Sequence, residues 1–149
     1  MREIRFRAFD QRTNKMHYSS KDITVWCGGS ECSVNSNEGK INGDFIPMQY
    51  TGLKDKNGKQ IYEGDLIAEV DKIEDLKKWG TPLTVCFGEY IGENDSWGIP
   101  SVTTGFFLRY NKGSSEGEIT GIHNRKTGYG FEASEVMVVG NIYMNSDLL

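Results

Sequence analysis

Residues 48–70, MQYTGLKDKNGKQIYEGDLIAEV, carry the strongest secondary-structure signals in the chain. Its centre, Asn57-Gly58, supplies the positive backbone dihedrals that a tight hairpin turn requires. Glu63-Gly64-Asp65 makes a second turn, in which Gly64 bends the chain and Asp65 is expected to hydrogen-bond the backbone. The apolar residues that follow, 66–70, read as a strand. The stretch therefore predicts strands joined by short turns.

Hairpin signals continue toward the N-terminus. Residues 3–8 alternate, with Ile4, Phe6 and Ala8 on one face of a predicted strand. Residues 10–15 form a polar turn cluster, and residues 16–18 can return as the partner strand. A short apolar stretch at 23–26 predicts a further strand.

The C-terminal half carries three more strand patterns. Leu83, Val85 and Phe87 alternate with polar positions and are expected inside, and residues 105–110 form a strand joined to them by a loop or a bent hairpin. Residues 136–139 are too apolar to face water on either side. The only helical spacing lies in 71–79, where Ile73, Leu76 and Trp79 could share one side.

These patterns predict a mainly β fold. We expect antiparallel hairpins forming a small barrel or a sandwich-like arrangement, with at most one or two short helices. The chain is expected to be a single unit over residues 1–149, with long variable loops near 27–46 and 111–130. The first loop is read either as irregular chain or as a short hairpin around Ile41.

Composition limits the cellular compartments and the classes of partner that can be expected. The 149 residues carry a formal net charge of -4, which argues against a general nucleic-acid coat protein. Three cysteines, an odd number, and an N-terminus without a signal-peptide pattern favour reduced thiols in a cytoplasm. No apolar run approaches the ~18 residues of a membrane span.

Residues that could carry chemistry do not form a recognisable site. Cys27 and Cys32 lie close in sequence, Cys86 is far downstream, and His17 and His123 are apart, so neither a metal nor a cofactor is predicted and the thiols are read as buried and free. The carboxylates of the 63–65 turn are better explained by turn formation than by acid–base catalysis. Phosphate-binding and nucleophile-elbow patterns are missing from the sequence, so no catalytic residue is predicted.

One local charge asymmetry stands out near the N-terminus. Arg5 and Arg7 are expected on one face of the first strand, and Arg12 and Lys15 follow in the turn. In an acidic protein this is a positive patch that could bind phosphate or carboxylates of a partner. The alternative is a row of ion pairs within the chain or between subunits, which would also protect a strand edge.

Three blocks of sequence resemble a known family. They are residues 2–10 with Lys15-Met16, residues 48–65, and residues 139–149. In this order they resemble the YopX family of phage and prophage proteins, although Phe9 stands where a tryptophan is more usual. The resemblance implies a β-rich protein in the cytoplasm of a bacterial host, and it supplies no activity or catalytic residues.

Three functions follow as hypotheses. The first is a phage or prophage accessory protein that self-associates as a homo-oligomer and binds a host or phage protein. The second is a nucleic-acid-binding protein that uses the N-terminal arginine face with Tyr18 or Tyr50. The third is a hydrolase using a carboxylate or Cys86, which no motif supports. A membrane partner is not expected.

Overall fold

The computed structural model describes residues 3–18, 23–28, 31–36, 45–94, 100–111, 119–123 and 131–149. The chain divides into two compact units, Met1–Gly52 and Leu53–Leu149. The boundary falls inside one strand, β5 (Phe45–Lys54), so no linker sequence marks it. Each unit is described by itself.

The first unit is built on strand β1 (Phe6–Asp10), which pairs antiparallel with both β2 (Lys15–Tyr18) and β5. Within this unit β1 lies between β2 and β5; the next strand along the chain, β6 (Gln60–Tyr62), belongs to the second unit. The predicted opening hairpin is confirmed. Its turn is held by the Asp10 carboxylate, which accepts hydrogen bonds from the Arg12 amide at 2.9 Å and the Thr13 hydroxyl at 2.8 Å.

Burial along β1 differs from the predicted alternation. Arg7 is only 4% exposed and neighbouring Ala8 is fully buried, whereas Ile4, just before the strand, is 70% exposed. The prediction was wrong because β1 is a central strand whose two faces are both covered. Arg7 to Asp10 are all buried, so neither face of β1 is open to water.

A separate two-stranded sheet completes the first unit. Strands β3 (Ile23–Gly28) and β4 (Glu31–Ser36) pair antiparallel. The expected loop at 27–46 is therefore wrong over Glu31–Ser36, where small polar residues obscured a strand; residues 37–44, with the alternative hairpin around Ile41, lie outside the described residues. Ile23 and Val34 pack with Ala8 in one apolar cluster, beside Val25 and Phe45.

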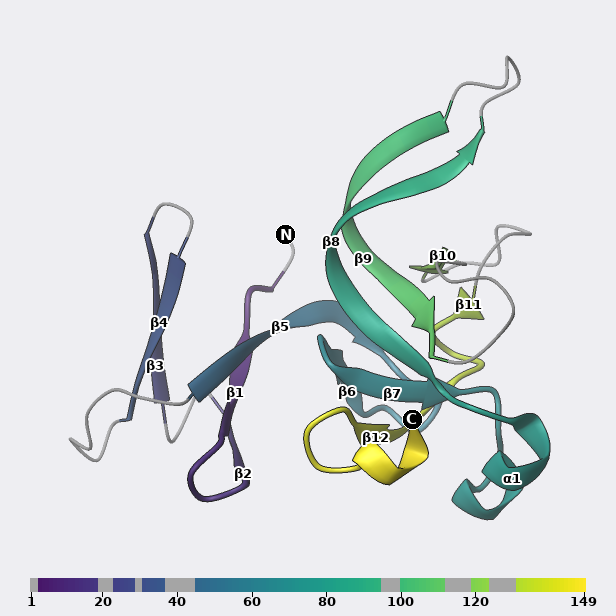
Figure 1. Ribbon diagram of the computed structural model, residues 1–149, viewed down its shortest axis with the longest axis horizontal. Coiled ribbons are helices and arrows are strands. Elements are labelled where there is room, and N and C mark those ends of the chain that lie inside the picture. Colours follow the sequence, from purple (N-terminus) through teal and green to yellow (C-terminus); the bar gives the residue numbers. More distant parts are fainter. Residues whose placement is uncertain are drawn as a thin grey trace. The chain divides into compact units, whose positions relative to one another are not determined.

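The second unit is a six-stranded sheet of order β11-β10-β9-β8-β7-β12 (Figure 1). Neighbouring strands are antiparallel except β10 and β11, which are parallel. The predicted mainly β class is confirmed. The strands are β7 (Asp65–Ala68), β8 (Leu83–Asn94), β9 (Pro100–Tyr110), β10 (Ile119–His123), β11 (Phe131–Glu132) and β12 (Met137–Asn141).

The helices of this unit are short. The η1 turn (Ile73–Asp75) and α1 (Leu76–Trp79) form the predicted helical stretch, and η2 (Ser146–Leu148) lies near the end of the chain. Leu76 is 7% exposed, but Ile73 is 57% exposed, so the two do not share a buried side as expected. None of the three residues of η1 is buried, so the apolar contact with the core begins only at Leu76.

Strands β7 and β12 have apolar cover on both faces. Ile67 and Val138 belong to one core cluster, and Leu66 and Val139 belong to another. This confirms that residues 136–139 avoid water on either side. Ordinary strand alternation places Val138 and Val139 in opposite clusters, and the register with β7 shifts between Val138 and Gly140.

Strands β8 and β9 form one long, strongly curved hairpin (Figure 1), which confirms the bent-hairpin alternative over residues 88–94 and 100–101; residues 95–99 lie outside the described residues. Leu83 and Val85 are 1% exposed, as predicted, but Phe87 is 45% exposed. The hairpin extends past the core at this point, and Phe87 packs on Phe106 with ring centroids 4.9 Å apart. The expected loop at 111–130 is wrong over β10; residues 112–118 and 124–130 lie outside the described residues.

The turn at 55–59 depends on one buried carboxylate. Asp55 Oδ1 accepts the amides of Asn57 and Lys59, each at 2.9 Å, and Asp55 Oδ2 accepts the amide of Val138 at 2.9 Å. Gly58 takes a φ of 79° whereas Asn57 does not have a positive φ, so one residue of the predicted pair supplies the left-handed backbone. The Asp55 carboxylate therefore links this turn to β12.

Two further turns, at residues 62–65 and 141–145, are joined by a backbone hydrogen bond. Asp65 Oδ2 accepts the Tyr62 amide at 2.8 Å, which confirms the role expected for this carboxylate. The Gly64 carbonyl accepts the Ile142 amide at 2.9 Å. Asn145 Oδ1 accepts the Asn141 amide at 3.1 Å, and it lies 2.9 Å from where a Cβ on Gly140 would stand. A side chain at position 140 would therefore displace the asparagine that shapes the turn.

Candidate functional site

The four residues of the predicted N-terminal patch occupy different environments. Arg7 is 4% exposed, and its guanidinium donates to Met48 Sδ at 3.6 Å. Arg5, Arg12 and Lys15 are exposed. The structure therefore does not place Arg5 and Arg7 together on an open strand face.

Acidic neighbours offset much of the remaining positive charge. Arg5 pairs with Glu3 at 2.6 Å, and Arg12 Nε lies 3.9 Å from Asp10 Oδ1. Arg5 and Glu3 are both exposed, so their pair contributes little stability, whereas Asp10 is buried beside an exposed Arg12. Both carboxylates reduce the positive charge available to an anionic partner. This arrangement agrees with the ion-pair alternative weighed from the sequence.

The β3–β4 hairpin presents a different surface. Trp26 is 69% exposed, and its register partner on β4 is Ser33. Thr24 and its partner Asn35 lie on the same face and are also exposed. We call this set of four residues the Trp26 face. The opposite face of the hairpin carries Ile23, Val25 and Val34, which pack inward.

Sequence reasoning missed the Trp26 face, although its signal was present. Residues 23–26 alternate between inward Ile23 and Val25 and outward Thr24 and Trp26. A tryptophan on the polar side of an alternating strand is an exception to the burial expected of large apolar residues. Without β4 assigned, however, the stretch had no partner strand that would define two faces.

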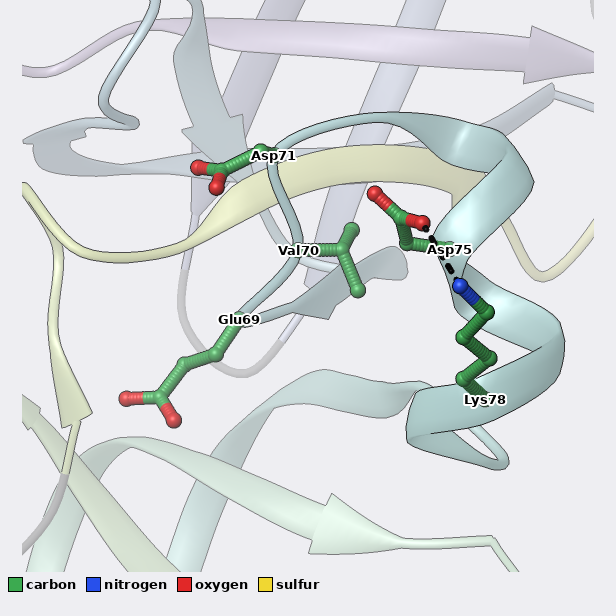
Figure 2. Close-up of a pocket in the computed structure, with 5 residues that line it drawn as sticks. All are labelled: Glu69, Val70, Asp71, Asp75 and Lys78. Atoms are coloured by element: carbon green, nitrogen blue, oxygen red, sulfur yellow. Dashed lines mark ion pairs between the residues drawn. The ribbon is translucent and has the colours of Figure 1, made fainter.

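A shallow depression in the second unit is lined by Glu69, Val70, Asp71, Asp75 and Lys78 (Figure 2). It has a volume of about 310 Å³ and opens widely to solvent. Lys78 Nζ lies 3.9 Å from Asp75, and Lys56 Nζ contacts Asp71 at 2.7 Å. Hydrogen bonding and the charge of Lys56 hold the pKa of Asp71 below its usual value. Asp71 and Asp75 are each already paired with a lysine, which suits a solvated surface.

Cys86, named in the hydrolase hypothesis, is half-buried on β8. Burial raises the pKa of its thiol, while Arg109 lowers it and Glu63 raises it further. Its Sγ lies 3.8 Å from the Thr84 carbonyl. A raised pKa keeps the thiol protonated at neutral pH, which is unfavourable for a nucleophile.

Over the described part of the chain, no group of three or more His, Cys, Asp or Glu residues could hold a metal ion. His17 instead packs edge-on against Phe45, with ring centroids 5.7 Å apart. Within the same residues, no helix is both long and apolar enough to cross a membrane.

Comparison with known proteins places the chain in a family. A crystal structure of protein EF1440 from Enterococcus faecalis is similar, with a TM-score of 0.52 and 19% identity over 100% of this chain and 99% of that one. At this identity the likeness shows the fold alone. No protein with a curated description matches the sequence. A family model described as YopX protein matches residues 5–149. The chain therefore belongs to the YopX family.

Proposed function

We propose that this protein is a self-associating protein-binding module whose interface is the β3–β4 hairpin, and that its partner is a second copy of the chain. The observation that carries this proposal is the exposure of Trp26, at 69%, on a strand face otherwise formed by small polar residues. The protein would act as a phage or prophage accessory protein in the cytoplasm of a bacterial host.

The composition of the Trp26 face suits protein recognition. Tryptophan is enriched among residues that dominate binding energy, because one rigid side chain buries a large area at low entropic cost. Serine, threonine and asparagine nearby provide adaptable hydrogen bonds. Trp26 with Ser33 and Asn35 has this combination.

The strand edges support a second copy as the partner. Among the described strands, β3 and β4 pair with each other and with no other strand. Their sequences, ITVWCG and ECSVNS, contain no lysine, arginine or proline to block further strand pairing. An edge of this kind can pair with its own copy across a two-fold axis, which makes a closed dimer.

Nucleic-acid binding receives less support. Arg7 is buried and is therefore not part of an exposed positive patch. The carboxylates of Glu3 and Asp10 offset the positive charges of Arg5 and Arg12. A polyanion would have to displace these carboxylates and approach a chain whose net charge is -4.

The test is sedimentation velocity over a wide range of protein concentration. We expect the wild type to associate as concentration rises and Trp26→Ser to remain monomeric. Ile73→Ser is the matched control, because Ile73 is a 57% exposed apolar residue in the other unit and its loss should leave association unchanged. A wild type that stays monomeric throughout, or a Trp26→Ser variant that associates like the wild type, would overturn the proposal.

A further inference from the structure

Two cysteines lie opposite each other in the β3–β4 hairpin. Cys27 on β3 is the register partner of Cys32 on β4, and the next pair, Gly28 with Glu31, is the last before the turn. The five-residue separation of the cysteines in sequence is thus the result of a hairpin that folds back between them. The sequence pattern alone did not reveal this juxtaposition.

The register satisfies the backbone requirement of a disulfide bond. Directly opposed residues of an antiparallel pair have Cα atoms about 4.5 Å or 5.5 Å apart, depending on their hydrogen-bonding position. Disulfides span Cα separations of about 4.4–6.8 Å. Opposed positions also share one face of the sheet. A bridge between positions 27 and 32 therefore requires no change of strand pairing.

We propose that Cys27 and Cys32 form a reversible intramolecular disulfide, with a small-molecule disulfide such as glutathione disulfide as the oxidant. One cysteine thiolate attacks a sulfur of the oxidant and releases one glutathione thiolate. The second cysteine then attacks the mixed disulfide and releases the other. The protein loses two protons and two electrons, and the oxidant is reduced to two thiols.

The bridge would fix the hairpin that carries Trp26. A two-stranded sheet is marginally stable by itself, and a covalent link beside the turn limits the open conformations of both strands. Because Trp26 adjoins Cys27, the oxidised hairpin would present the Trp26 face in a more ordered form. This consequence rests on the proposed function, whereas formation of the disulfide does not.

Cys86 provides an internal reference. It is a free cysteine in the second unit, on β8, and burial raises the pKa of its thiol. It is therefore expected to react slowly with disulfides. The same sample thus contains one cysteine pair predicted to react and one cysteine predicted not to.

The experiment equilibrates the full chain with graded ratios of oxidised to reduced glutathione, traps free thiols by alkylation, and measures intact mass and peptide linkage. We expect a monomeric product that has lost two hydrogens, carries a Cys27–Cys32 link and retains one free thiol at Cys86. Cys86→Ser should form the same link, and Cys27→Ser should form no internal link. Persistence of all three thiols, a stable glutathione adduct, a link to Cys86 or an intermolecular link would overturn the proposal.

A second arm compares sedimentation of the oxidised and reduced protein. We expect the oxidised form to associate at severalfold lower concentration. Equal association by both forms would overturn the redox control of association while leaving the measured disulfide in place. Failure of the Trp26→Ser test alongside a formed bridge would overturn the proposed function alone.

Discussion

At the scale of single residues, the most informative group is the Asp55 carboxylate. It lies in the middle block of the family resemblance, it is 5% exposed, and it ties its own turn to the amide of Val138 in β12. The sequence predicted a turn here from Asn57-Gly58. It could not predict the link to residue 138, because a contact over 83 positions depends on the tertiary arrangement.

Replacing Asp55 by alanine should destabilise the protein by about 2–4 kcal/mol, because three amides lose their acceptor and at least one of them is buried. The measurement is urea-induced unfolding. Asp71→Asn is the control, since Asp71 is an exposed partner of Lys56 and its replacement should change stability much less than Asp55→Ala does. Equal effects of the two substitutions would contradict the role assigned to Asp55.

Asp10 makes stability depend on pH. Burial opposes ionisation of Asp10, but the Thr13 hydroxyl, the amides of Arg12 and Thr13, and the charge of Arg12 outweigh it and lower the pKa below the usual 3.8. The folded state therefore favours the ionised carboxylate. Its contribution to stability is full above the unfolded pKa and is lost as pH falls through the folded pKa.

The stability difference between the wild type and Asp10→Asn should accordingly be larger near pH ~7 than near pH ~3. Thr13→Val removes one of the hydrogen bonds to Asp10. The stability difference between the wild type and Thr13→Val should therefore also shrink from pH ~7 to pH ~3, but by less than the difference between the wild type and Asp10→Asn. Urea unfolding of the three proteins at both pH values provides the measurement. A difference between the wild type and Asp10→Asn that is the same at both pH values would rule out this linkage.

At the scale of elements, the sequence predicted strands better than it predicted their faces. Leu83 and Val85 are buried as expected. Phe87 follows the same alternation but is half-exposed, because the hairpin extends beyond the residues that form the core. Arg7 shows the opposite error. The alternating pattern predicted that Arg7 is exposed, whereas both faces of β1 are covered and Arg7 is buried. Periodicity identifies a strand, whereas the reach of the core along that strand is a tertiary property.

The β3–β4 hairpin is the element on which the candidate site depends. Its inward face contributes Ile23, which is 1% exposed and packs with Ala8 and Val34. No motif predicted this element, because ECSVNS contains a single β-branched residue. What the sequence did show was the local alternation of residues 23–26.

Ile23→Ala should loosen the hairpin and cost about 2–4 kcal/mol if the first unit unfolds as a whole. Hydrogen exchange over residues 23–36 should become faster, because the inward packing that orders a two-stranded sheet is reduced. Ile73→Ala, an exposed isoleucine in the other unit, is the matched control and should leave exchange over residues 23–36 nearly unchanged. Equal exchange in the wild type and Ile23→Ala would show that this packing does not order the hairpin.

At the scale of the whole molecule, the three blocks of the family resemblance have structural roles. Residues 2–10 provide the central strand of the first unit, and Asp55, Asp65 and Asn145 shape turns of the second. The mainly β class could be predicted because hairpin turns have local signatures. Two compact units could not, because their boundary lies within the continuous strand β5.

Association of two copies through the β3–β4 hairpin can be followed by hydrogen exchange with mass-spectrometric readout at low and high protein concentration. Amides of residues 23–36 should exchange more slowly at high concentration, and Trp26→Ser should abolish this protection. Unchanged exchange across the hairpin, or concentration-dependent protection confined to other strands, would contradict it.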